Sequence, residues 1–553
     1  MVDLHIHSVN SDGTFTPSEI IDIALKKELK AIALTDHYTV KGMGEIYNYG
    51  KYKGIELIAG TEISTTYLGV SVHVLGYYLN PFKKEFNDNM NNFLVSRTAR
   101  NEQIAARMNE LGIKINYEEF LKEMGTRVVT RAHLAKYMVQ KGYASTITDA
   151  FDKYLNPGMP CYVPRAKVTP SKAVEMILSG NGIAVLAHPL QYEFSEDVLE
   201  NLIKEMIDAG MKGMEVYYSK YNPEQIKYLE GLADKYGLIK TGGSDCHGDN
   251  RPGCEIGTGY GDMKVPDIAV SNLKEEYLKN FKVSDKPGIM FFDMDGSLLS
   301  EKKVITPATL EALDDCVKKG YVFSISTGRP LKSIVELSDR LGLTERYKPL
   351  ISSYNGSVIY DTSKKEILAE ECHSSDTVKT VREIAYKNGV HIHSYSIDEI
   401  LTERETEEVK EYCKYIKMDY KIIDDMLNND KTYKLMIMDL NDNALLQRVR
   451  DEVMAAVGDK VECVFSAPIL LEVLPKESGK GNALITMSKL LGVDVDNTYA
   501  FADAENDITM LKAAGRGVCL INGYPKAMEA ATHISFTDND HDGLVPFLRE
   551  LVK

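Results

Sequence analysis

The chain has 553 residues, a formal net charge of −16 and a sequence pI of about 5.4. A chain of this length predicts roughly three to five folding units, each large enough to bury a core. Its acidic balance argues against a broad binding surface for long nucleic acid. The sequence has no apolar run of about 18 residues, so no membrane span is expected.

The cysteines and the first residues indicate a cytoplasmic location. Eight cysteines with no paired spacing are typical of reduced thiols. The first five residues, Met-Val-Asp-Leu-His, contain neither the basic nor the apolar region of a signal peptide. We therefore expect neither a cleaved leader nor a disulfide framework.

The first predicted strand, Val2–His7, alternates apolar and polar residues. Its apolar residues would face one side of the sheet, and His5 and His7 would face the other. Two imidazoles spaced by two residues on one strand face can bind a single metal ion. The start of the chain therefore indicates a metal site.

A helix is predicted directly after this strand. Thr16 is a suitable N-cap, Pro17 suits the first helical position, and Glu19 can close a capping box. The helix is expected to run as far as Lys30.

Further apolar strands follow, most of them ending at a side chain that can bind metal. They are predicted at residues 31–34 before Asp36 and His37, 54–59 near Glu62, 183–187 before His188, 213–218, and 238–243 before Asp245 and His247. In α/β barrels the active site lies at the carboxyl ends of the strands. A single buried histidine is more often a hydrogen-bonded core residue, but histidines and carboxylates at several strand ends indicate one metal centre.

Residues 1–283 resemble the PHP (polymerase and histidinol phosphatase) domain, a distorted (β/α)7 barrel. The resemblance is carried by His5-x-His7, Thr35-Asp36-His37, His188-Pro189 and Asp245-x-His247. It implies three divalent metals held by His5, His7, Asp12, His37, Glu62, His73, His188, Asp245 and His247. It also implies that Glu62 bridges the metals and that Asp36 orients a neighbouring ligand.

Mixed nitrogen and oxygen ligands suit Mn, Fe or Zn and exclude a soft thiolate site. Clustered metals can activate a bridging water and clamp the oxygens of a phosphoryl group. The chemistry expected of this domain is phosphoester hydrolysis without a covalent enzyme intermediate.

An insertion at about residues 84–168 is expected, because more than 100 residues separate His73 from His188. A helix over 91–111 would place Ile104, Met108 and Leu111 on one face, and a second helix would start at Thr130. The Arg131-x-His133 pattern near that start resembles the PHP subgroup that acts on nucleotides. Members of that subgroup hydrolyse nucleoside 3',5'-bisphosphates, nucleoside monophosphates, or short RNA from its 5' end.

Basic side chains of the insertion are candidates for binding substrate phosphate, because arginine offers a bidentate fork. The first candidates are Arg131 and His133. A basic stripe on the preceding helix is formed by Arg97, Arg100 and Arg107. The competing interpretation is a solvated helix face paired with acidic neighbours. Arg251, soon after His247, is either a further substrate contact or a structural residue.

A second catalytic signature begins after a hinge at 286–288. The apolar run 289–292 predicts a strand covered on both faces, which leads into Asp293-Met294-Asp295-Gly296-Ser297. A strand at 321–326 ends at Thr327-Gly328-Arg329, and the segments 478–481 and 500–507 supply Lys480, Asp503, Asn506 and Asp507. These segments predict a doubly wound sheet with carboxylates at its C-terminal edge.

The residue types at this edge predict phosphoryl transfer. Asp293 is the expected nucleophile, forming an aspartyl-phosphate, and Asp295 the general acid and then base. Thr327 and Lys480 would neutralise the transferring group. Oxygen ligands suit Mg²⁺, and the predicted ligands are Asp293, Asp295, Asp503 and Asp507. Arg329 and Asn506 are expected to contact substrate.

Residues 286–553 resemble the Cof-type branch of the haloacid dehalogenase (HAD) superfamily. The resemblance implies a Rossmann-like core with an α/β cap at about 368–460, and phosphatase activity on sugar phosphates, nucleotides or phosphorylated cofactors. Two positions depart from the family pattern. Ser297 replaces the usual threonine and keeps the hydroxyl, and Ala502 replaces the usual glycine before Asp503.

Together these features predict a bifunctional phosphoesterase for small phosphorylated metabolites or nucleotides, with no membrane or long nucleic acid as partner. One hypothesis is that the two sites act in sequence on one substrate. Two alternatives remain: the first domain is a 5'-3' exoribonuclease on short RNA, or one module is a non-catalytic nucleotide sensor. A histidinol-phosphate phosphatase is less favoured because of the long insertion.

Overall fold

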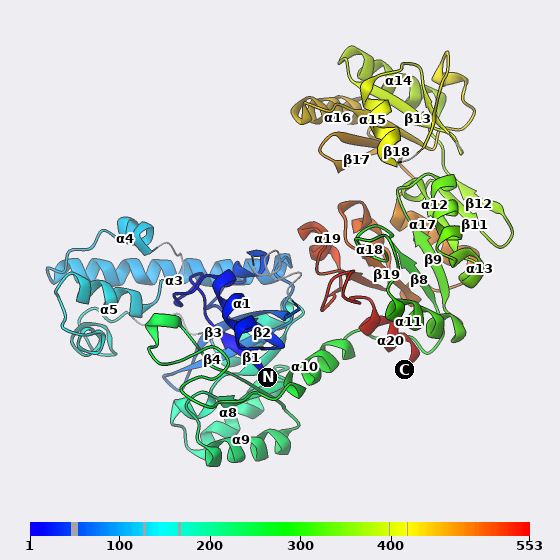
Figure 1. The fold of residues 1–553 in the computed structure, drawn as a ribbon. Coiled ribbons are helices and arrows are strands. Elements are labelled where there is room, and N and C mark those ends of the chain that lie inside the picture. Colours follow the sequence, from blue (N-terminus) through cyan, green and yellow to red (C-terminus); the bar gives the residue numbers. More distant parts are fainter. Residues whose placement is uncertain (46–53, 125–128, 164–167, 398, 417) are drawn as a thin grey trace. The chain divides into compact units, whose positions relative to one another are not determined.

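The computed structural model describes residues 1–45, 54–124, 129–163, 168–397, 399–416 and 418–553. The chain forms two compact units, Met1–Asn280 and Phe281–Lys553 (Figure 1). Within the described ranges, no helix has the length and apolar character needed to cross a membrane.

The first unit is built on a seven-stranded sheet whose spatial order follows the sequence. Its strands are β1 (Val2–Ile6), β2 (Ala31–Leu34), β3 (Glu56–Tyr67), β4 (Val70–Tyr77), β5 (Ile183–Leu186), β6 (Gly213–Tyr218) and β7 (Ile239–Gly243). β4 is antiparallel to both of its neighbours, and the other pairs are parallel. The last segment returns to the first strand: the Asp245 amide donates to the His5 carbonyl (2.7 Å), and the His7 amide donates to the Cys246 carbonyl (3.0 Å). The sheet is therefore a nearly closed barrel, as the sequence predicted.

Two glycines permit close backbone approach beside the first strand. A Cβ on Gly243 would lie 2.3 Å from the His5 nitrogen, and one on Gly13 would lie 2.2 Å from the His7 carbonyl oxygen. Any side chain at either position would push these backbones apart. Gly243 thus allows the barrel to close, and Gly13 allows the loop carrying Asp12 to fold back against β1.

The long β3–β4 hairpin is where the strand prediction was wrong. β3 was expected to end near Glu62, but it continues to Tyr67, and Glu62 pairs with Leu75 inside the ladder. The turn consists of Leu68 and Gly69, which both have positive φ (49° and 89°). Such a two-residue turn matches the twist of a hairpin. Glu62 and His73, both predicted to bind metal, therefore project from the middle of paired strands.

Helices cover the outside of the barrel: α1 (Pro17–Lys26), α7 (Pro170–Ser179), α8 (Glu196–Asp208), α9 (Pro223–Tyr236) and α10 (Ile268–Lys279). The predicted capping box at Thr16 and Glu19 is present. The helix ends at Lys26 instead of Lys30, because Glu28 adopts a left-handed φ of 55° and the Leu29 amide turns back to the Ala24 carbonyl.

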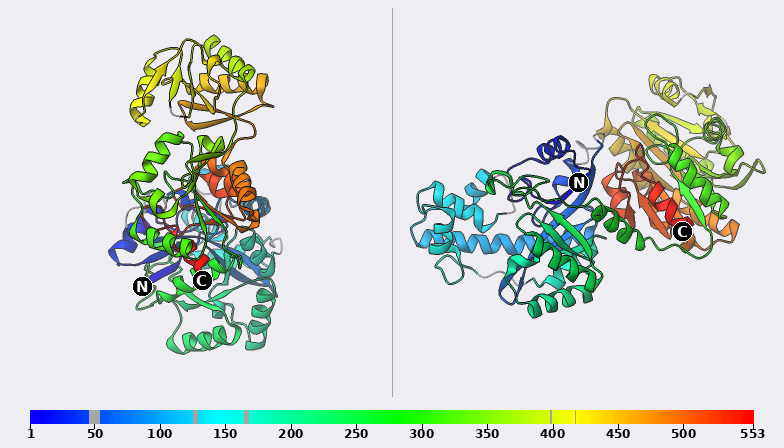
Figure 2. Two further views of the ribbon diagram at one scale, coloured as in Figure 1. Left: turned by 90° about the vertical axis from the view of Figure 1, so that its right-hand side faces the viewer. Right: turned by 60° about the horizontal axis from the view of Figure 1, so that its bottom comes forward.

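The insertion between β4 and β5 has a hydrophobic core of its own. It comprises α3 (Lys84–Glu110), α4 (Tyr117–Met124), α5 (Arg131–Gln140), α6 (Ile147–Ala150) and a π-helical turn, η1 (Phe151–Leu155). Phe86 and Met90 on α3 pack in the barrel core, whereas Ile104 and Met108 pack in the insertion core. α3, the long light-blue helix of Figures 1 and 2, therefore bridges the two. It begins seven residues earlier than the predicted 91, and Leu111, expected on the buried face, is 49% exposed.

The second unit contains an eight-stranded core sheet in the order β12-β11-β10-β9-β8-β19-β20-β21. The strands are β8 (Ile289–Phe292), β9 (Val322–Ser326), β10 (Leu350–Ser353), β11 (Val358–Asp361), β12 (Glu366–Glu370), β19 (Thr498–Ala502), β20 (Arg516–Cys519) and β21 (His533–Ile534). All neighbours are parallel except the edge strands β11 and β12. β8, which leads to Asp293, lies between β9 and β19, so the predicted motifs converge at one sheet edge.

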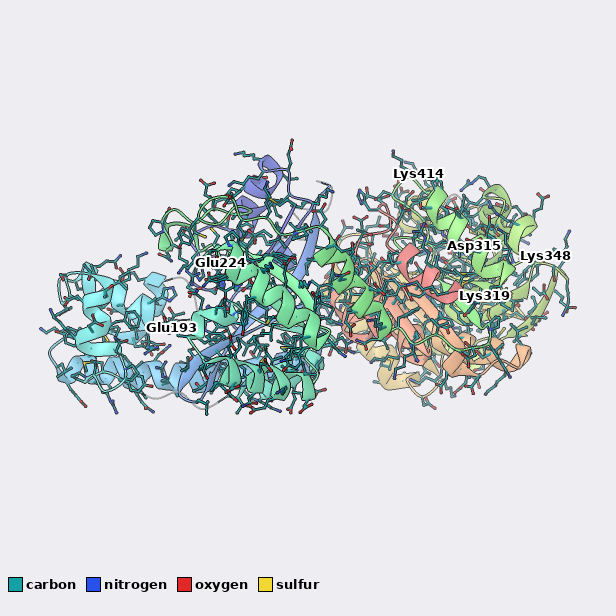
Figure 3. All side chains as sticks on the ribbon, turned by 90° about the horizontal axis from the view of Figure 1, so that it is seen from below. Glu193, Glu224, Asp315, Lys319, Lys348 and Lys414 are labelled. Atoms are coloured by element: carbon teal, nitrogen blue, oxygen red, sulfur yellow. The ribbon has the colours of Figure 1, made fainter. Side chains whose placement is uncertain are left out.

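The core sheet is flanked by α11 (Pro307–Lys318), α12 (Leu331–Arg340), α13 (Leu343–Tyr347), α17 (Lys480–Leu491), α18 (Ile508–Ala513), α19 (Pro525–Ala530) and α20 (Val545–Val552). The first and last of these pack together. Lys319, which follows α11 and is labelled in Figure 3, donates to the Leu551 carbonyl on α20 at 3.1 Å. The C-terminal helix thus joins the layer that begins the domain.

The cap is a six-stranded sheet with helices. Its strands are β13 (His391–Tyr395), β14 (Ile400–Thr402), β15 (Tyr420–Ile422), β16 (Lys434–Met438), β17 (Val461–Ala467) and β18 (Leu470–Pro475), and its helices are α14 (Ser375–Lys387), α15 (Glu407–Ile416) and α16 (Asn443–Val457). α14 and α16 pack on one face through a core that includes Val381, Val449, Ile437 and Val473. The sheet extends beyond the expected limit of 460, because the β17–β18 hairpin completes it.

Candidate active sites

The nine side chains expected to bind metal in the first unit converge at one end of the barrel. Their ligand atoms form three groups, and the atoms within each group lie within 4.8 Å of one another. The groups are His7, Asp12, His37 and His247; His5, His7 and Asp245; and Glu62, His73 and His188. His7 belongs to the first two groups, and its Nε2 lies 3.3 Å from Glu62 of the third, so the three groups form one continuous cluster.

Glu62 lies at the centre of the cluster and is 1% exposed. Its Oε1 lies 2.8 Å from His73 Nδ1, 3.3 Å from His188 Nε2 and 3.6 Å from His5 Nε2. Its Oε2 lies 3.3 Å from both His7 Nε2 and His37 Nδ1. A carboxylate that reaches histidines of all three groups is placed as a bridging ligand would be.

Several ligand atoms of this cluster are buried with no hydrogen-bond partner in the described part of the chain. They are His5 Nε2, His7 Nε2, Asp12 Oδ1 and His188 Nδ1. A buried polar atom left unsatisfied costs about 1–3 kcal/mol. Four such atoms in one cluster are explained if cations satisfy them, so the residues present fit a multinuclear metal site.

The electrostatics of the cluster favour cations. Burial by itself would lower the pKa of His7, but the neighbouring carboxylates of Asp245 and Glu62 raise it to about 10. Burial would raise the pKa of Glu62, yet the nearby histidines, His73 first, hold it well below its usual range. By contrast, burial lowers the pKa of His37 to about 3. Glu62 therefore stays ionised although it is buried, as a metal ligand must.

Glu215 is a functional residue that the sequence analysis missed. It lies on β6, is fully buried, and its Oε1 is 2.9 Å from His5 Nδ1. Its Oε2 accepts the backbone N–H of His188 at 2.8 Å. Because Glu215 accepts a hydrogen bond from the Nδ1–H group of His5, the Nε2 atom of His5 is left to face the cluster. A signal was available, since Glu215 is the one charged residue in the strand Gly213–Tyr218.

Replacing Glu215 with glutamine should weaken metal binding by about 10- to 100-fold, the usual effect of losing a partner behind a ligating histidine. Chelator competition, followed by metal analysis, would measure the change. Glu230→Gln is a matched control, because Glu230 is another hydrogen-bonded glutamate, which accepts the Tyr217 hydroxyl at 2.9 Å, but it is not in the cluster. Equal metal retention in the two variants would contradict the assigned role.

Asp36 and Asp245 hold the loops that carry ligands. Asp36 accepts from the Ser8 amide (2.7 Å), the Ser8 hydroxyl (2.6 Å) and the Ser11 hydroxyl (2.5 Å). It therefore organises the turn between His7 and Asp12. The backbone of Asp245 adopts a strained left-handed conformation with a φ of 54°. Its carboxylate accepts a hydrogen bond from the Tyr218 hydroxyl at 2.8 Å.

Arg251 contacts Asp245, one of the predicted metal ligands. Its guanidinium donates to Asp245 Oδ2 and, at 3.1 Å, to the Asp245 carbonyl. With Oδ2 held by Arg251 and Tyr218, the other oxygen, Oδ1, faces His5 and His7 at 3.5 and 3.4 Å. Of the two interpretations of Arg251, the structure supports the structural one.

The basic residues of the insertion make internal contacts. Arg131 donates to the Leu155 carbonyl at 3.0 Å, and its guanidinium lies 5.6 Å from the centre of the Phe151 ring. His133 Nδ1 accepts the Thr130 amide at 3.0 Å and so closes a capping box. Arg100 is 7% exposed and donates to the Val163 carbonyl at 2.8 Å. The side chain of Arg97 lies outside the described atoms, and Arg107 donates to the Tyr162 carbonyl.

The insertion nevertheless reaches the loop beside the metal cluster. Lys136 on α5 places its Nζ 3.5 Å from Asn250 Oδ1, and Asn250 donates to the Asp12 carbonyl at 2.8 Å. Lys136, which the sequence analysis did not single out, is thus the basic side chain of α5 that adjoins the ligand loops.

The second site lies where β8 and β19 end. Ligand oxygens of Asp293, Asp503 and Asp507 lie within 4.8 Å of one another. Lys480 Nζ is 2.6 Å from Asp293 Oδ1 and 2.5 Å from Asp507 Oδ1, and the lysine is 1% exposed. Burial raises the pKa of Asp503 to about 7, and burial and the nearby carboxylates raise that of Asp293 well above its usual value. Three crowded buried carboxylates fit a hard cation such as Mg²⁺, whose charge would offset their repulsion.

Asp295 stands apart from this group of three. Its carboxylate receives two hydrogen bonds from Arg329, at 2.8 and 2.9 Å, and one from Lys303 at 2.7 Å. Arg329, expected to contact substrate, therefore contacts the expected general acid. Lys303 gave no signal in the sequence beyond being a lysine in a loop.

The remaining motif residues surround these carboxylates. Ser297 stands where the family usually has threonine. Its hydroxyl donates to Asp503 Oδ1 at 2.6 Å, so the substitution keeps a hydroxyl that makes a contact. Ala502 is fully buried within β19. Thr327 Oγ1 accepts the Arg329 amide at 3.2 Å. Gly296 has a φ of 87°, and a Cβ there would lie 2.4 Å from Asp503 Oδ2, so only glycine fits.

Comparison with known families matches both halves. The PHP domain matches residues 3–157, and the haloacid dehalogenase-like hydrolase family matches residues 290–548. A 3',5'-nucleoside bisphosphate phosphatase of Chromobacterium violaceum is 30% identical over 257 residues, which are 46% of this chain and 90% of that protein. The chain belongs to the PHP family in its first half and to the haloacid dehalogenase-like hydrolases in its second.

Other similar proteins also match one half each. A 5'-3' exoribonuclease of Haemophilus influenzae is 33% identical to the PHP half over 245 residues, 44% of this chain and 89% of that protein. The crystal structure of a haloacid dehalogenase-like hydrolase from Bacteroides thetaiotaomicron is 28% identical to the HAD half, covers 48% of this chain and 100% of that chain, and has a TM-score of 0.43. The protein is thus a hydrolase of phosphoric esters with two domains, and both families imply divalent metals.

Proposed function

We propose that the PHP half hydrolyses phosphate esters of nucleotides, with nucleoside 3',5'-bisphosphates or monophosphates as substrates and three bound metal ions. The observation that carries this proposal is the cluster of nine ligand residues around Glu62. The name of the Chromobacterium violaceum relative supports the substrate class.

Metal ions in such a cluster would lower the pKa of a bound water and neutralise the phosphoryl oxygens. The protein's own groups would do the rest. Glu215 keeps the Nε2 atom of His5 facing inward, and Arg251 and Tyr218 hold Asp245 in its strained conformation. Phosphate contacts are proposed for Arg131, His133, Arg97 and Arg100, and we add Lys136 because of its place beside the ligand loops.

We further propose that the HAD half is a Mg²⁺-dependent phosphatase. An Asp293 oxygen would attack phosphorus, the bond to the leaving oxygen would break, and Asp295 would supply the proton to that oxygen. Asp295 would then take a proton from the water that cleaves the aspartyl-phosphate. Lys480, in contact with Asp293 and Asp507, would offset negative charge throughout.

The exoribonuclease alternative is favoured by the Haemophilus influenzae relative. An Asp293→Asn chain, in which only the PHP half should be active, would be given adenosine 3',5'-bisphosphate and a 5'-labelled RNA pentamer in parallel. Release of phosphate from the bisphosphate with an intact pentamer supports the phosphatase. Stepwise release of mononucleotides at a similar kcat/KM would establish the exoribonuclease instead. No turnover of either substrate, with no bound metal, would favour the nucleotide sensor.

The fusion of two phosphoesterases also motivates the hypothesis of sequential action on one bisphosphate. His7→Ala and Asp293→Asn chains would be compared on a panel of phosphorylated metabolites. Accumulation of a different monophosphate in each variant supports sequential action. Full activity of each variant on disjoint substrates would show that the two sites work independently.

A further inference from the structure

A buried ion pair lies on the face of the cap sheet opposite α14 and α16. Lys434 on β16 and Glu472 on β18 are 1% and 5% exposed, and Lys434 Nζ lies 3.3 Å from Glu472 Oε1. Strand alternation places them here: Leu435, Ile437, Leu471 and Val473 point into the apolar core under the helices. The Lys434 ammonium also lies 4.8 Å from the centre of the Tyr395 ring.

Both charged side chains reach from the cap into catalytic loops of the core. Glu472 Oε2 accepts from Asn355 Nδ2 at 2.5 Å, and Asn355 Oδ1 accepts from Asn506 Nδ2 at 3.1 Å. Asn506 lies in the turn Glu505–Asp507, which also carries the candidate metal ligand Asp507. Lys434 donates to the Gly328 carbonyl at 3.3 Å, between Thr327 and Arg329.

The surroundings of Asn355 show that this connection is tightly held. Asn355 adopts a left-handed φ of 52°, and the next residue, Gly356, has a φ of 104°. A Cβ on Gly356 would lie 2.4 Å from the carbonyl oxygen of Gly479, the residue before Lys480. Strained backbone of this kind persists only where the surrounding contacts over-determine it. The turn that carries Asn355 thus contacts Glu472 of the cap on one side and packs closely against the start of α17 on the other.

Stability of the cap alone is a poor explanation for the pair. Burying two charges carries a desolvation penalty, and an apolar pair of similar volume often stabilises a fold as well or better. Lys434 Nζ also contacts the loop that carries Thr327, and Glu472 Oε2 contacts Asn355, which accepts from Asn506. The arrangement links the cap to the catalytic edge of the core sheet.

We propose that Lys434 and Glu472 are positioning residues of the HAD reaction. Glu472 holds the Asn506–Asp507 turn through Asn355, and Lys434 holds the Thr327 loop through the Gly328 carbonyl. The positions of catalytic groups in the core therefore depend on the contacts that the cap makes with the core loops. This inference rests on the proposed phosphatase function of the HAD half.

The two residues should give different kinetic defects. Lys434→Met should lower kcat by on the order of 10- to 100-fold, with little change in KM, because the Thr327 loop is misplaced. Glu472→Leu should raise the Mg²⁺ concentration for half-maximal rate by about 10-fold, since it loosens the turn carrying Asp507. Glu472→Gln, which keeps an oxygen for Asn355, should restore most of the Mg²⁺ response.

The rates would be measured on full-length chains with p-nitrophenyl phosphate, after subtracting the rate of Asp293→Asn. Arg382→Met is the matched control. It breaks a half-buried ion pair with Glu403 (2.9 Å) that lies wholly within the cap. Thermal unfolding of each variant would show whether the cap is intact. If the larger changes unfold it, Lys434→Gln and Glu472→Ala, smaller changes with the same expected defects, would be measured in their place.

Distinct defects in kcat and in Mg²⁺ response, absent from Arg382→Met, support the positioning role. Kinetics of Lys434→Met and Glu472→Leu equal to those of Arg382→Met would overturn it. If instead Asp293→Asn kept the full rate, the proposed phosphatase function would fail, which is a separate result.

Discussion

Replacing His7 with alanine should remove hydrolysis of nucleoside bisphosphates by the PHP half. His7 is fully buried, belongs to two of the three ligand groups, and its Nε2 lies 3.3 Å from Glu62 and 3.4 Å from Asp245. Losing even an outer partner of a metal ligand costs about 10- to 100-fold, so loss of a shared ligand should cost at least about 100-fold in kcat/KM. Elemental analysis should show fewer metal ions per chain.

His541→Ala is a suitable control for this experiment. The His541 side chain is 48% exposed and contacts Asp538 in the second unit. The His541→Ala substitution should leave metal content and bisphosphate hydrolysis at the level of the unmodified chain. A His7→Ala chain with full metal content and an unchanged kcat/KM would show that the cluster is not the catalytic centre of the PHP half.

Replacing Asp293 with asparagine should abolish the phosphatase activity of the HAD half. The amide keeps the size of the carboxylate and can still accept from Lys480, which lies 2.6 Å from Asp293 Oδ1. It cannot form the acyl phosphate. Removing a nucleophile typically lowers kcat by on the order of 10⁴ or more. Phosphate release from sugar phosphates and p-nitrophenyl phosphate would measure the loss, and mass spectrometry after rapid quenching would detect the phosphorylated chain.

Asp314→Asn provides a matched comparison in the same unit. Asp314 accepts from Arg346 and from the Tyr347 hydroxyl, each within 2.9 Å, but lies outside the carboxylate group of the site. This variant should keep both the rate and the phosphorylated intermediate. If Asp293→Asn retained the intermediate, or more than about a tenth of the rate, another residue would have to be the nucleophile.

Local patterns in the sequence were sufficient for several elements of the fold. Apolar runs predicted β2 and β6 with the bounds that the structure has, and the capping box at Thr16 is present. These features depend on neighbours a few residues apart, so the sequence carries them directly. Family motifs extended the prediction from strands and helices to the two sites, because each motif contains the residues that its chemistry requires.

Sequence patterns were insufficient where partners lie far apart in the chain. Glu62 lies inside β3 and not near its end, because pairing with β4 extends the strand. The phosphate contacts expected of Arg131 and His133 stay a prediction, and packing adds contacts that the motif did not indicate: Arg131 donates to the Leu155 carbonyl and His133 accepts the Thr130 amide. Periodicity does not show which polar side chain meets which distant carbonyl, since such contacts depend on three-dimensional packing.

The sequence by itself therefore determined the candidate residues of the two sites, their order along the chain and the strands that carry most of them. Only the tertiary structure decided which distant residues position these side chains. Closure of the barrel brings His5 to Glu215, 210 residues away, and seating of the cap brings Asn355 to Glu472, 117 residues away. Contacts over such separations form only when whole layers pack, and no local pattern encodes them.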